Sequence, residues 1–143
     1  MVQLGELGEQ VTAQWLQGQG WEILATRWRC RWGELDIVAC DTATQLIFVE
    51  VKTRQAQNWD ADGLLALTPQ KQAKLRRAAG MFLSAYPQYA HWPCRFDLAL
   101  VKARLLSSNE DCQPTLPAIT LNTAIGWQGY ALTLSTYLQG IDD

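Results

Sequence analysis

The chain has 143 residues, a hydrophobic fraction of 48% and seven tryptophans, which together predict one globular domain with its own core. No apolar run approaches the roughly 20 residues that cross a bilayer, and the opening MVQLGELGEQ lacks the basic and apolar segments typical of a secretion signal. The single histidine excludes His-based metal clusters and argues against Ser-His-Asp hydrolysis. The four cysteines form no CxxC pair, so we expect reduced thiols, a cytoplasmic location and no membrane partner.

Charge is unevenly distributed along the chain, although its formal sum is only −2. All twelve Lys and Arg lie between Arg27 and Arg104, a span that also holds seven of the fourteen acidic residues. A basic middle between acidic ends suits modest binding to a phosphate backbone. A solvated charged surface explains the same distribution, so charge alone leaves both interpretations open.

The first predicted element is a helix over residues 3–17, which ends at the glycines that follow. Its glutamines and Glu6 share one polar stripe, and an apolar face lies to one side of that stripe. Glu9 falls on the other side, among small residues where another element could approach closely. We therefore expect Glu6 in solvent and Glu9 close to a neighbouring element.

Three strands are predicted next, from the segments WEILATRW, GELDIVAC and QLIFVEVKTR. A second helix follows, because Thr68 is a good N-cap, Pro69 is a good first residue, and Pro87 lies beyond the end. On this helix Lys71 borders the apolar stripe and is expected to point toward the sheet, whereas Lys74 lies well off the stripe.

The remaining predicted elements are a strand from RFDLALVKA, a polar loop at 107–117 and a final hairpin turned between Gly126 and Gly129. The order α-β-β-β-α-β with a β tail predicts an α/β fold, in which helices flank a mixed central β-sheet. We expect a single domain over residues 1–143, with a core of about 3–104 and a C-terminal extension at 105–143.

The segment GELDIVACDTATQLIFVEVKTR carries charges inside two apolar runs, and a hairpin register explains where they lie. If the turn is centred on Ala43, one face is wholly apolar and suits packing under a helix. The pairs on that face are Leu35 with Val51, Ile37 with Val49, and Ala39 with Ile47. The pairs on the other face are Val38 with Phe48, Asp36 with Glu50, and Glu34 with Lys52.

Asp36 and Glu50 would then stand roughly 4.5–5.5 Å apart at their Cβ atoms, where like charges repel. Either one carboxyl is protonated or a cation lies between them, and Mg²⁺ suits such a pair because it takes one or two carboxylates and accepts phosphate oxygens. Lys52 lies near enough to contact a water or a phosphate there. A Glu34–Lys52 ion pair beside a tolerated Asp–Glu contact is the structural alternative, and periodicity leaves both open.

These residues resemble the PD-(D/E)XK nuclease superfamily, whose pattern is an Asp, a spacer, and Glu-x-Lys on a neighbouring strand. Here the pattern is Leu35-Asp36 followed by Glu50-Val51-Lys52. More closely, the chain resembles the YraN-like family of uncharacterised bacterial proteins, which is similar to archaeal Holliday-junction resolvases. The matching segments are GELGEQVTAQWLQGQGWEIL, GELDIVACDTATQLIFVEVKTR, TPQKQAKLRRAA, RFDLALV and ITLNTAI. The tail after Arg104 departs from the family and inherits nothing from it.

The resemblance implies a restriction-endonuclease-like fold and a divalent-metal-dependent endonuclease that hydrolyses DNA, including branched or structured DNA. Asp36, Glu50 and Glu9 would hold Mg²⁺ or Mn²⁺, and Lys52 would orient or deprotonate the attacking water. The basic residues expected along a nucleic-acid backbone are Lys71, Lys74, Arg77, Arg29, Arg31 and Arg54.

Several functional alternatives remain at the level of the sequence. The stretch TRWRCRW could stack single-stranded bases, or it could be a twisted strand with arginines and tryptophans on opposite faces. A non-catalytic nucleic-acid-binding or scaffold protein that retains the nuclease fold is the alternative to an enzyme. The acidic ends are compatible with a protein partner, and the C-terminal hairpin is compatible with a homodimer.

Overall fold

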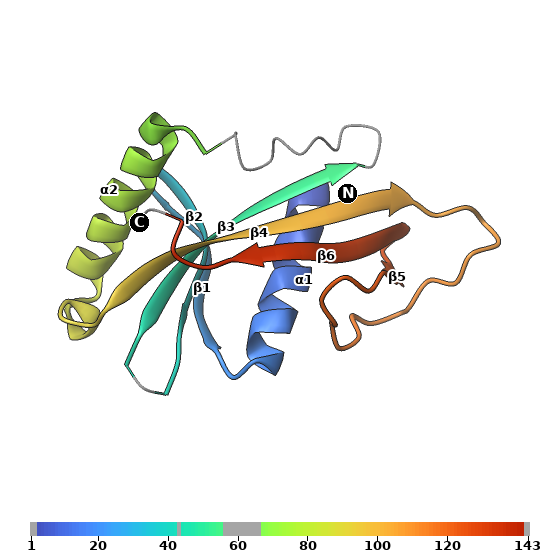
Figure 1. Ribbon diagram of the computed structural model, residues 1–143, viewed down its shortest axis with the longest axis horizontal. Helices are drawn as coiled ribbons and strands as arrows, with labels where there is room; N and C mark the ends of the chain where they lie inside the picture. Colours follow the sequence, from blue (N-terminus) through green and yellow to red (C-terminus); the bar gives the residue numbers. More distant parts are fainter. Residues whose placement is uncertain (1–2, 43, 56–66, 142–143) are drawn as a thin grey trace.

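The computed structural model describes residues 3–42, 44–55 and 67–141, and it places two helices on a single mixed sheet (Figure 1). The elements in chain order are α1 (Leu4–Gly18), β1 (Glu22–Cys30), β2 (Gly33–Cys40), β3 (Leu46–Gln55), α2 (Pro69–Ala85), the 3₁₀ helix η3 (Pro87–Tyr89), β4 (Cys94–Leu105), β5 (Ile125–Trp127) and β6 (Tyr130–Leu138). The predicted α/β class and the order α-β-β-β-α-β with a β tail are confirmed.

The six strands lie in the order β1-β2-β3-β4-β6-β5. Every neighbouring pair is antiparallel except β3 and β4, which run parallel. Parallel neighbours need a crossover connection, and the segment that contains α2 makes this connection between β3 and β4. In the described part of the chain, neither helix is long and apolar enough to span a bilayer.

One core cluster lies between α1 and the sheet. Leu7, Val11 and Leu16 of α1 are at most 1% exposed, and they pack with alternate residues of β2 and β3. The sheet residues in this cluster include Ile37, Ala39, Ile47, Val49 and Val51. The apolar face predicted for the β2–β3 hairpin is therefore confirmed at these five positions.

A second core cluster lies between α2 and the opposite face of the sheet. Ala78, Ala79 and Phe82 of α2 are buried there with Phe48 of β3, and the Phe82 ring meets Phe48 edge-on with centroids 6.0 Å apart. The start of α2 is capped as predicted, because Thr68 Oγ1 accepts a hydrogen bond from the Lys71 amide at 3.2 Å.

The C-terminal extension forms the predicted hairpin. Gln128 and Gly129 join β5 to β6 with φ values of +55° and +83°, which is the left-handed backbone of a two-residue type I′ turn. Asp97 holds both the end of β6 and the residues after it. It is 0% exposed and accepts hydrogen bonds from Tyr137 Oη at 2.6 Å and from the Gly140 amide at 3.1 Å. After β6 the chain turns back toward α2 (Figure 1), and Ile141 borders a small hollow together with residues of that helix.

Helix α1 approaches β3 closely through Gly8. A Cβ atom added at this glycine would overlap Thr53 Oγ1, so the absence of a side chain at Gly8 lets α1 lie this near Thr53 of β3. The Thr12 hydroxyl, one turn later, donates to the Gly8 carbonyl at 2.8 Å. This contact determines where the next residue, Glu9, lies relative to the sheet.

Candidate functional site

The site begins where β2 and β3 stop pairing with each other. Their ladder joins Ile37 to Val49 and continues to Cys40 and Leu46, which is the register predicted around Ala43, although Ala43 itself lies outside the described residues. Past Ile37, Asp36 Oδ2 accepts a hydrogen bond from the Val51 amide at 2.8 Å. The side chain thus replaces a backbone acceptor, and the strands separate.

The separation corrects one predicted pair of the apolar face. Leu35 still pairs with Trp28 of β1, but it is buried in the cluster under α2 rather than against Val51 under α1. The sequence prediction assumed regular alternation of side chains through Asp36. The chain departs from that alternation there, because the Asp36 side chain is held by the β3 backbone. Residues before and after Asp36 therefore do not keep the alternation of a regular strand.

Three carboxylates meet at this point of separation. Glu9 comes from α1, and Glu34 and Asp36 come from β2; each offers an oxygen atom that lies within 4.8 Å of the others. Glu9 is 8% exposed and Asp36 is 9% exposed. The expectation that Glu9 lies close to another element is confirmed, since it lies near the first half of β2 and contacts Arg27 of β1.

Burial makes the charged forms of two of these carboxyls unfavourable. It raises the pKa of Glu9 to about 7, and the Arg27 guanidinium only partly offsets the effect. Burial together with the Glu50 charge raises the pKa of Asp36 to about 8, against the opposing hydrogen bond from Val51. Glu9 Oε1 is also buried with no hydrogen-bond partner among the described residues. A divalent cation with a preference for oxygen ligands fits such a donor set, because it would replace the protons.

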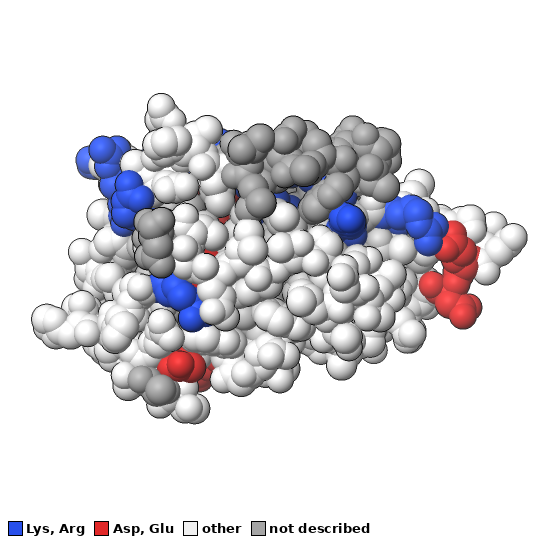
Figure 2. All heavy atoms as spheres, in the orientation of Figure 1, with Lys and Arg blue, Asp and Glu red and all other residues white. Residues whose placement is uncertain are grey.

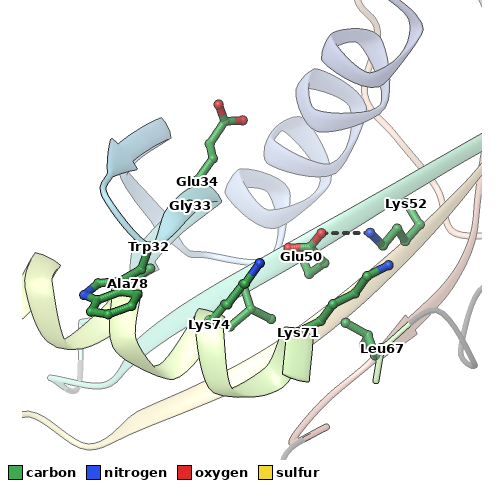
Figure 3. Close-up of a pocket in the computed structure, with 10 residues that line it drawn as sticks. Trp32, Gly33, Glu34, Glu50, Lys52, Leu67, Lys71, Lys74 and Ala78 are labelled. Atoms are coloured by element: carbon green, nitrogen blue, oxygen red, sulfur yellow. Dashed lines mark ion pairs between the residues drawn. The ribbon is translucent and has the colours of Figure 1, made fainter. Parts of the chain in front are cut away.

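Glu50 and Lys52 lie beside this cluster on β3. The Lys52 Nζ is 3.1 Å from Glu50 Oε1 (Figure 3), and both side chains are less than one-fifth exposed. The negative charge of Glu50 raises the pKa of Asp36, although the β2–β3 pairing ends at Ile37 and Val49 and does not include the predicted Asp36–Glu50 pair. The oxygen atoms that gather most closely, however, include Glu34 in place of Glu50.

The predicted partnership between Glu34 and Lys52 is wrong. Within the described ranges Glu34 forms no ion pair with Lys52; it lies 2.9 Å from Arg29 Nε and 3.5 Å from Arg27 Nε, both on β1. The cause is again the separation of the strands, which leaves Glu34 beside β1 alone. Glu34 lies two residues before Asp36, a spacing that places both side chains on one face of a strand. This spacing was the sequence signal that could have identified Glu34 as the third carboxylate of the cluster.

A cavity of about 240 Å³ opens on the α2 side of Glu50 and Lys52. Lys71 and Lys74 extend from α2 toward β3 and line it (Figure 3). Its other lining residues are Trp32, Gly33, Glu34, Leu67, Leu75 and Ala78. The expectation that Lys71 points toward the sheet is confirmed, and Lys74, expected off the packed stripe, lines the same cavity.

The other basic residues expected on a nucleic-acid backbone do not line this cavity. Arg31 and Arg77 each lie 4.7 Å from the centre of the Trp32 ring, Arg29 pairs with Glu34, and Arg54 donates to its neighbour's carbonyl. Figure 2 shows basic side chains spread over the visible face rather than gathered in one patch.

The stretch TRWRCRW follows the strand interpretation as far as Cys30, where β1 ends; Arg31 and Trp32 form the turn to β2, and Arg31 lies over the Trp32 ring. Trp28 and Trp32 pack against the cluster under α2, whereas Arg29 and Arg31 are exposed. Its tryptophans therefore contribute to the core, and this packing favours a structural role for both rings.

Comparison with known proteins places all of the site residues in one matched span. The model of "Uncharacterised protein family UPF0102" matches residues 8–101. A UPF0102 protein of Acaryochloris marina is 47% identical over 154 aligned residues, which cover 96% of this chain and 88% of that protein. A UPF0102 protein of Synechocystis is 42% identical over 144 aligned residues, which cover 96% of this chain and 96% of that protein. One of Thermosynechococcus vestitus is 56% identical over 102 residues, 71% of this chain and 82% of that protein. The chain therefore belongs to the uncharacterised protein family UPF0102.

Proposed function

We propose that this protein is a divalent-metal-dependent phosphodiesterase that acts on DNA and has the architecture of the PD-(D/E)XK nuclease superfamily. Two features support the proposal together. The Asp and Glu-x-Lys pattern stands on neighbouring strands, and the strands separate where the pattern begins, so that carboxylates from α1 and β2 converge.

The convergence of the carboxylates is the observation that carries the proposal. Glu9 and Asp36 are nearly fully buried, and their negative charges lie close to those of Glu34 and Glu50. Such an arrangement costs stability unless a proton or cation compensates it. A protein that served only as a scaffold would gain nothing from it.

Glu9 and Asp36 would hold Mg²⁺ or Mn²⁺, and Glu50 is the further predicted ligand. A bound divalent ion would polarise the scissile phosphate and lower the pKa of a bound water. Lys52, held next to Glu50, would orient the attacking water or offset negative charge that develops on the phosphate. Lys71 would neutralise phosphate charge from the opposite side of the cavity, without reading base sequence.

The test is cleavage of supercoiled, single-stranded and branched DNA by the full chain with Mg²⁺ or Mn²⁺. Cutting is expected to disappear with chelator, with Asp36→Asn and with Lys52→Ala, while circular dichroism shows that both variants remain folded. Cutting that survives both substitutions would come from a contaminating nuclease and would contradict the proposal. Tight, metal-independent DNA binding without cutting would also contradict it.

A non-catalytic DNA-binding or scaffold protein is the alternative function, and one observation favours it. The Arg27 side chain already lies among the carboxylates, 3.3 Å from Glu9 and 3.5 Å from Glu34. A built-in positive charge could stabilise the cluster without a metal. The DNA substrate, a homodimer and a protein partner all remain predictions.

A further inference from the structure

Arg27 on β1 contacts three carboxylates at once. Its Nη1 lies 3.2 Å from Glu6 Oε1, and its Nε lies 3.3 Å from Glu9 Oε1 and 3.5 Å from Glu34 Oε1. Glu9 is one of the two residues proposed to hold the metal, and Glu34 lies beside it in the same carboxylate cluster. The guanidinium, which stays charged at every accessible pH, therefore supplies positive charge where the cation would bind.

The backbone of Arg27 is held in an unfavourable conformation. Its φ is +50°, in the left-handed region that costs free energy for any residue with a Cβ atom. The neighbours Thr26 and Trp28 pair with Ile37 and Leu35, the two residues that flank Asp36. The bend thus occurs across from Asp36, and a strained conformation at such a place suggests a role in the site.

The ion pair with Glu9 is poorly formed, despite its burial. Arg27 Nε and Glu9 Oε1 are both buried without a hydrogen-bond partner in the described part of the chain, because their contact lacks hydrogen-bond geometry. Arg27 compensates the negative charge of Glu9 but forms no hydrogen bond with Glu9 Oε1. A buried oxygen in this state is open to a better partner.

Arg27 also has space in which to move. Its side chain is 34% exposed, and it borders a hollow of about 100 Å³ lined by residues of α1 and β1. The guanidinium can therefore leave Glu9 and Glu34 for solvent, or keep only Glu6, whose side chain is 37% exposed.

We propose that Arg27 is a displaceable internal counter-ion, which neutralises the carboxylate cluster in the metal-free protein and must leave Glu9 and Glu34 when a divalent cation binds. Arg27 then lowers metal affinity, because the cation competes with the guanidinium for Glu9 and for the negative charge of the cluster. This inference rests on the proposed function, because it requires a metal at the cluster.

The test is Mn²⁺ titration calorimetry on the full chain with Arg27→Gln and a matched control, Arg29→Gln. Both substitutions remove one positive charge from β1 and one contact with Glu34, but Arg29 is 78% exposed and does not contact Glu9. We expect Arg27→Gln to bind Mn²⁺ on the order of tenfold more tightly than the wild type. Arg29→Gln is expected to stay close to wild-type affinity.

Thermal unfolding provides a readout that does not depend on heat of binding. Without metal, Arg27→Gln is expected to melt below the wild type, because the cluster has lost its counter-ion. Added Mn²⁺ is expected to raise its melting temperature by more than that of the wild type. Arg27→Lys, which keeps the charge but cannot reach all three carboxylates, is expected to have an intermediate affinity.

The outcomes separate this inference from the proposed function. If no variant and no wild-type sample binds Mn²⁺, both are overturned. If the wild type binds Mn²⁺ but folded Arg27→Gln and Arg27→Lys bind with equal or lower affinity, only the counter-ion role is overturned. Equal tightening by Arg29→Gln would also overturn it, because the effect would then be general surface charge.

Discussion

Replacement of Gly8 by alanine is expected to destabilise the protein, because the new Cβ would overlap Thr53 Oγ1 and lie 3.1 Å from Thr53 Cβ. Threonine is stiff about χ1, so relief requires either a strained Thr53 rotamer or a shift of α1 away from β3. Overpacking of this kind costs about 1–3 kcal/mol. The better helix propensity of alanine returns at most about 1 kcal/mol.

Gly5→Ala is the matched control for this prediction. It lies in the same helix, and a Cβ there would meet no atom within 4 Å in the described part of the chain. It therefore gains helix propensity without a clash and should stabilise the protein by up to about 1 kcal/mol. The two alanine variants should differ by roughly 2 kcal/mol, or about 6 °C in melting temperature for a domain of this size.

Urea unfolding followed by tryptophan fluorescence measures the difference. The double variant Gly8→Ala/Thr53→Ala should recover most of the loss, since the overlapping Oγ1 is gone, and the coupling energy isolates the contact. Gly8→Ala should also weaken Mn²⁺ binding, because a shift of α1 moves Glu9 away from Asp36. The reasoning is refuted if Gly8→Ala is as stable as Gly5→Ala, or if Thr53→Ala does not rescue it.

Three further predictions concern the buried network, the carboxyls and the cavity. Tyr137→Phe removes a 2.6 Å hydrogen bond to a fully buried carboxylate and should cost about 1.5–3 kcal/mol in urea unfolding; an unchanged midpoint would contradict it. The folded protein binds protons at Glu9 and Asp36 more tightly than the unfolded chain, with pKa values of about 7 and about 8. The contribution of these two carboxyls to metal-free stability should therefore be full near pH 4 and be lost as pH rises to 8, and a metal-free melting temperature that rises between pH 5 and pH 8 would refute it. Lys71→Gln should weaken DNA binding in a fluorescence titration and lower the slope of log affinity against log salt concentration by about one. Arg76→Gln, on the same helix but outside the cavity beside Glu50 and Lys52, should have less effect in that titration.

Local patterns predicted the secondary structure well, because each pattern has a local physical cause. The cap at Thr68 depends on residues three positions apart, and the register that joins Ile37 to Val49 follows from alternating apolar residues on either side of a short turn. The odd position of Glu9 on α1 was also visible in helical periodicity. These predictions needed no knowledge of distant segments.

Predictions failed where a side chain interrupted a backbone pattern. Asp36 accepts a hydrogen bond from the Val51 amide, and the β2–β3 ladder ends there. As a result, Leu35 packs in the core cluster under α2. Glu34 pairs with Arg27 and Arg29. Alternation assumes that the pairing of two strands continues, so it could not indicate that the Asp36 side chain would end the pairing of β2 with β3.

Long-range contacts were also beyond the reach of the sequence patterns. Asp97 and Tyr137 are 40 residues apart, and nothing in RFDLALVKA indicated that its aspartate would be fully buried. Arg27, in TRWRCRW, was one basic residue among several, and its contacts with three carboxylates and its left-handed backbone appear only in the tertiary structure.

The amino-acid sequence by itself determined the order of the elements, the apolar faces of the hairpin and the set of acidic and basic residues from which a site could be built. The tertiary structure decided which of them meet. The close approach of α1 at Gly8 and the separation of β2 from β3 at Asp36 bring Glu9, Glu34 and Asp36 together around Arg27. The physical reason is that propensity and periodicity act over a few residues, whereas the energy of a buried charge depends on every group that surrounds it in space.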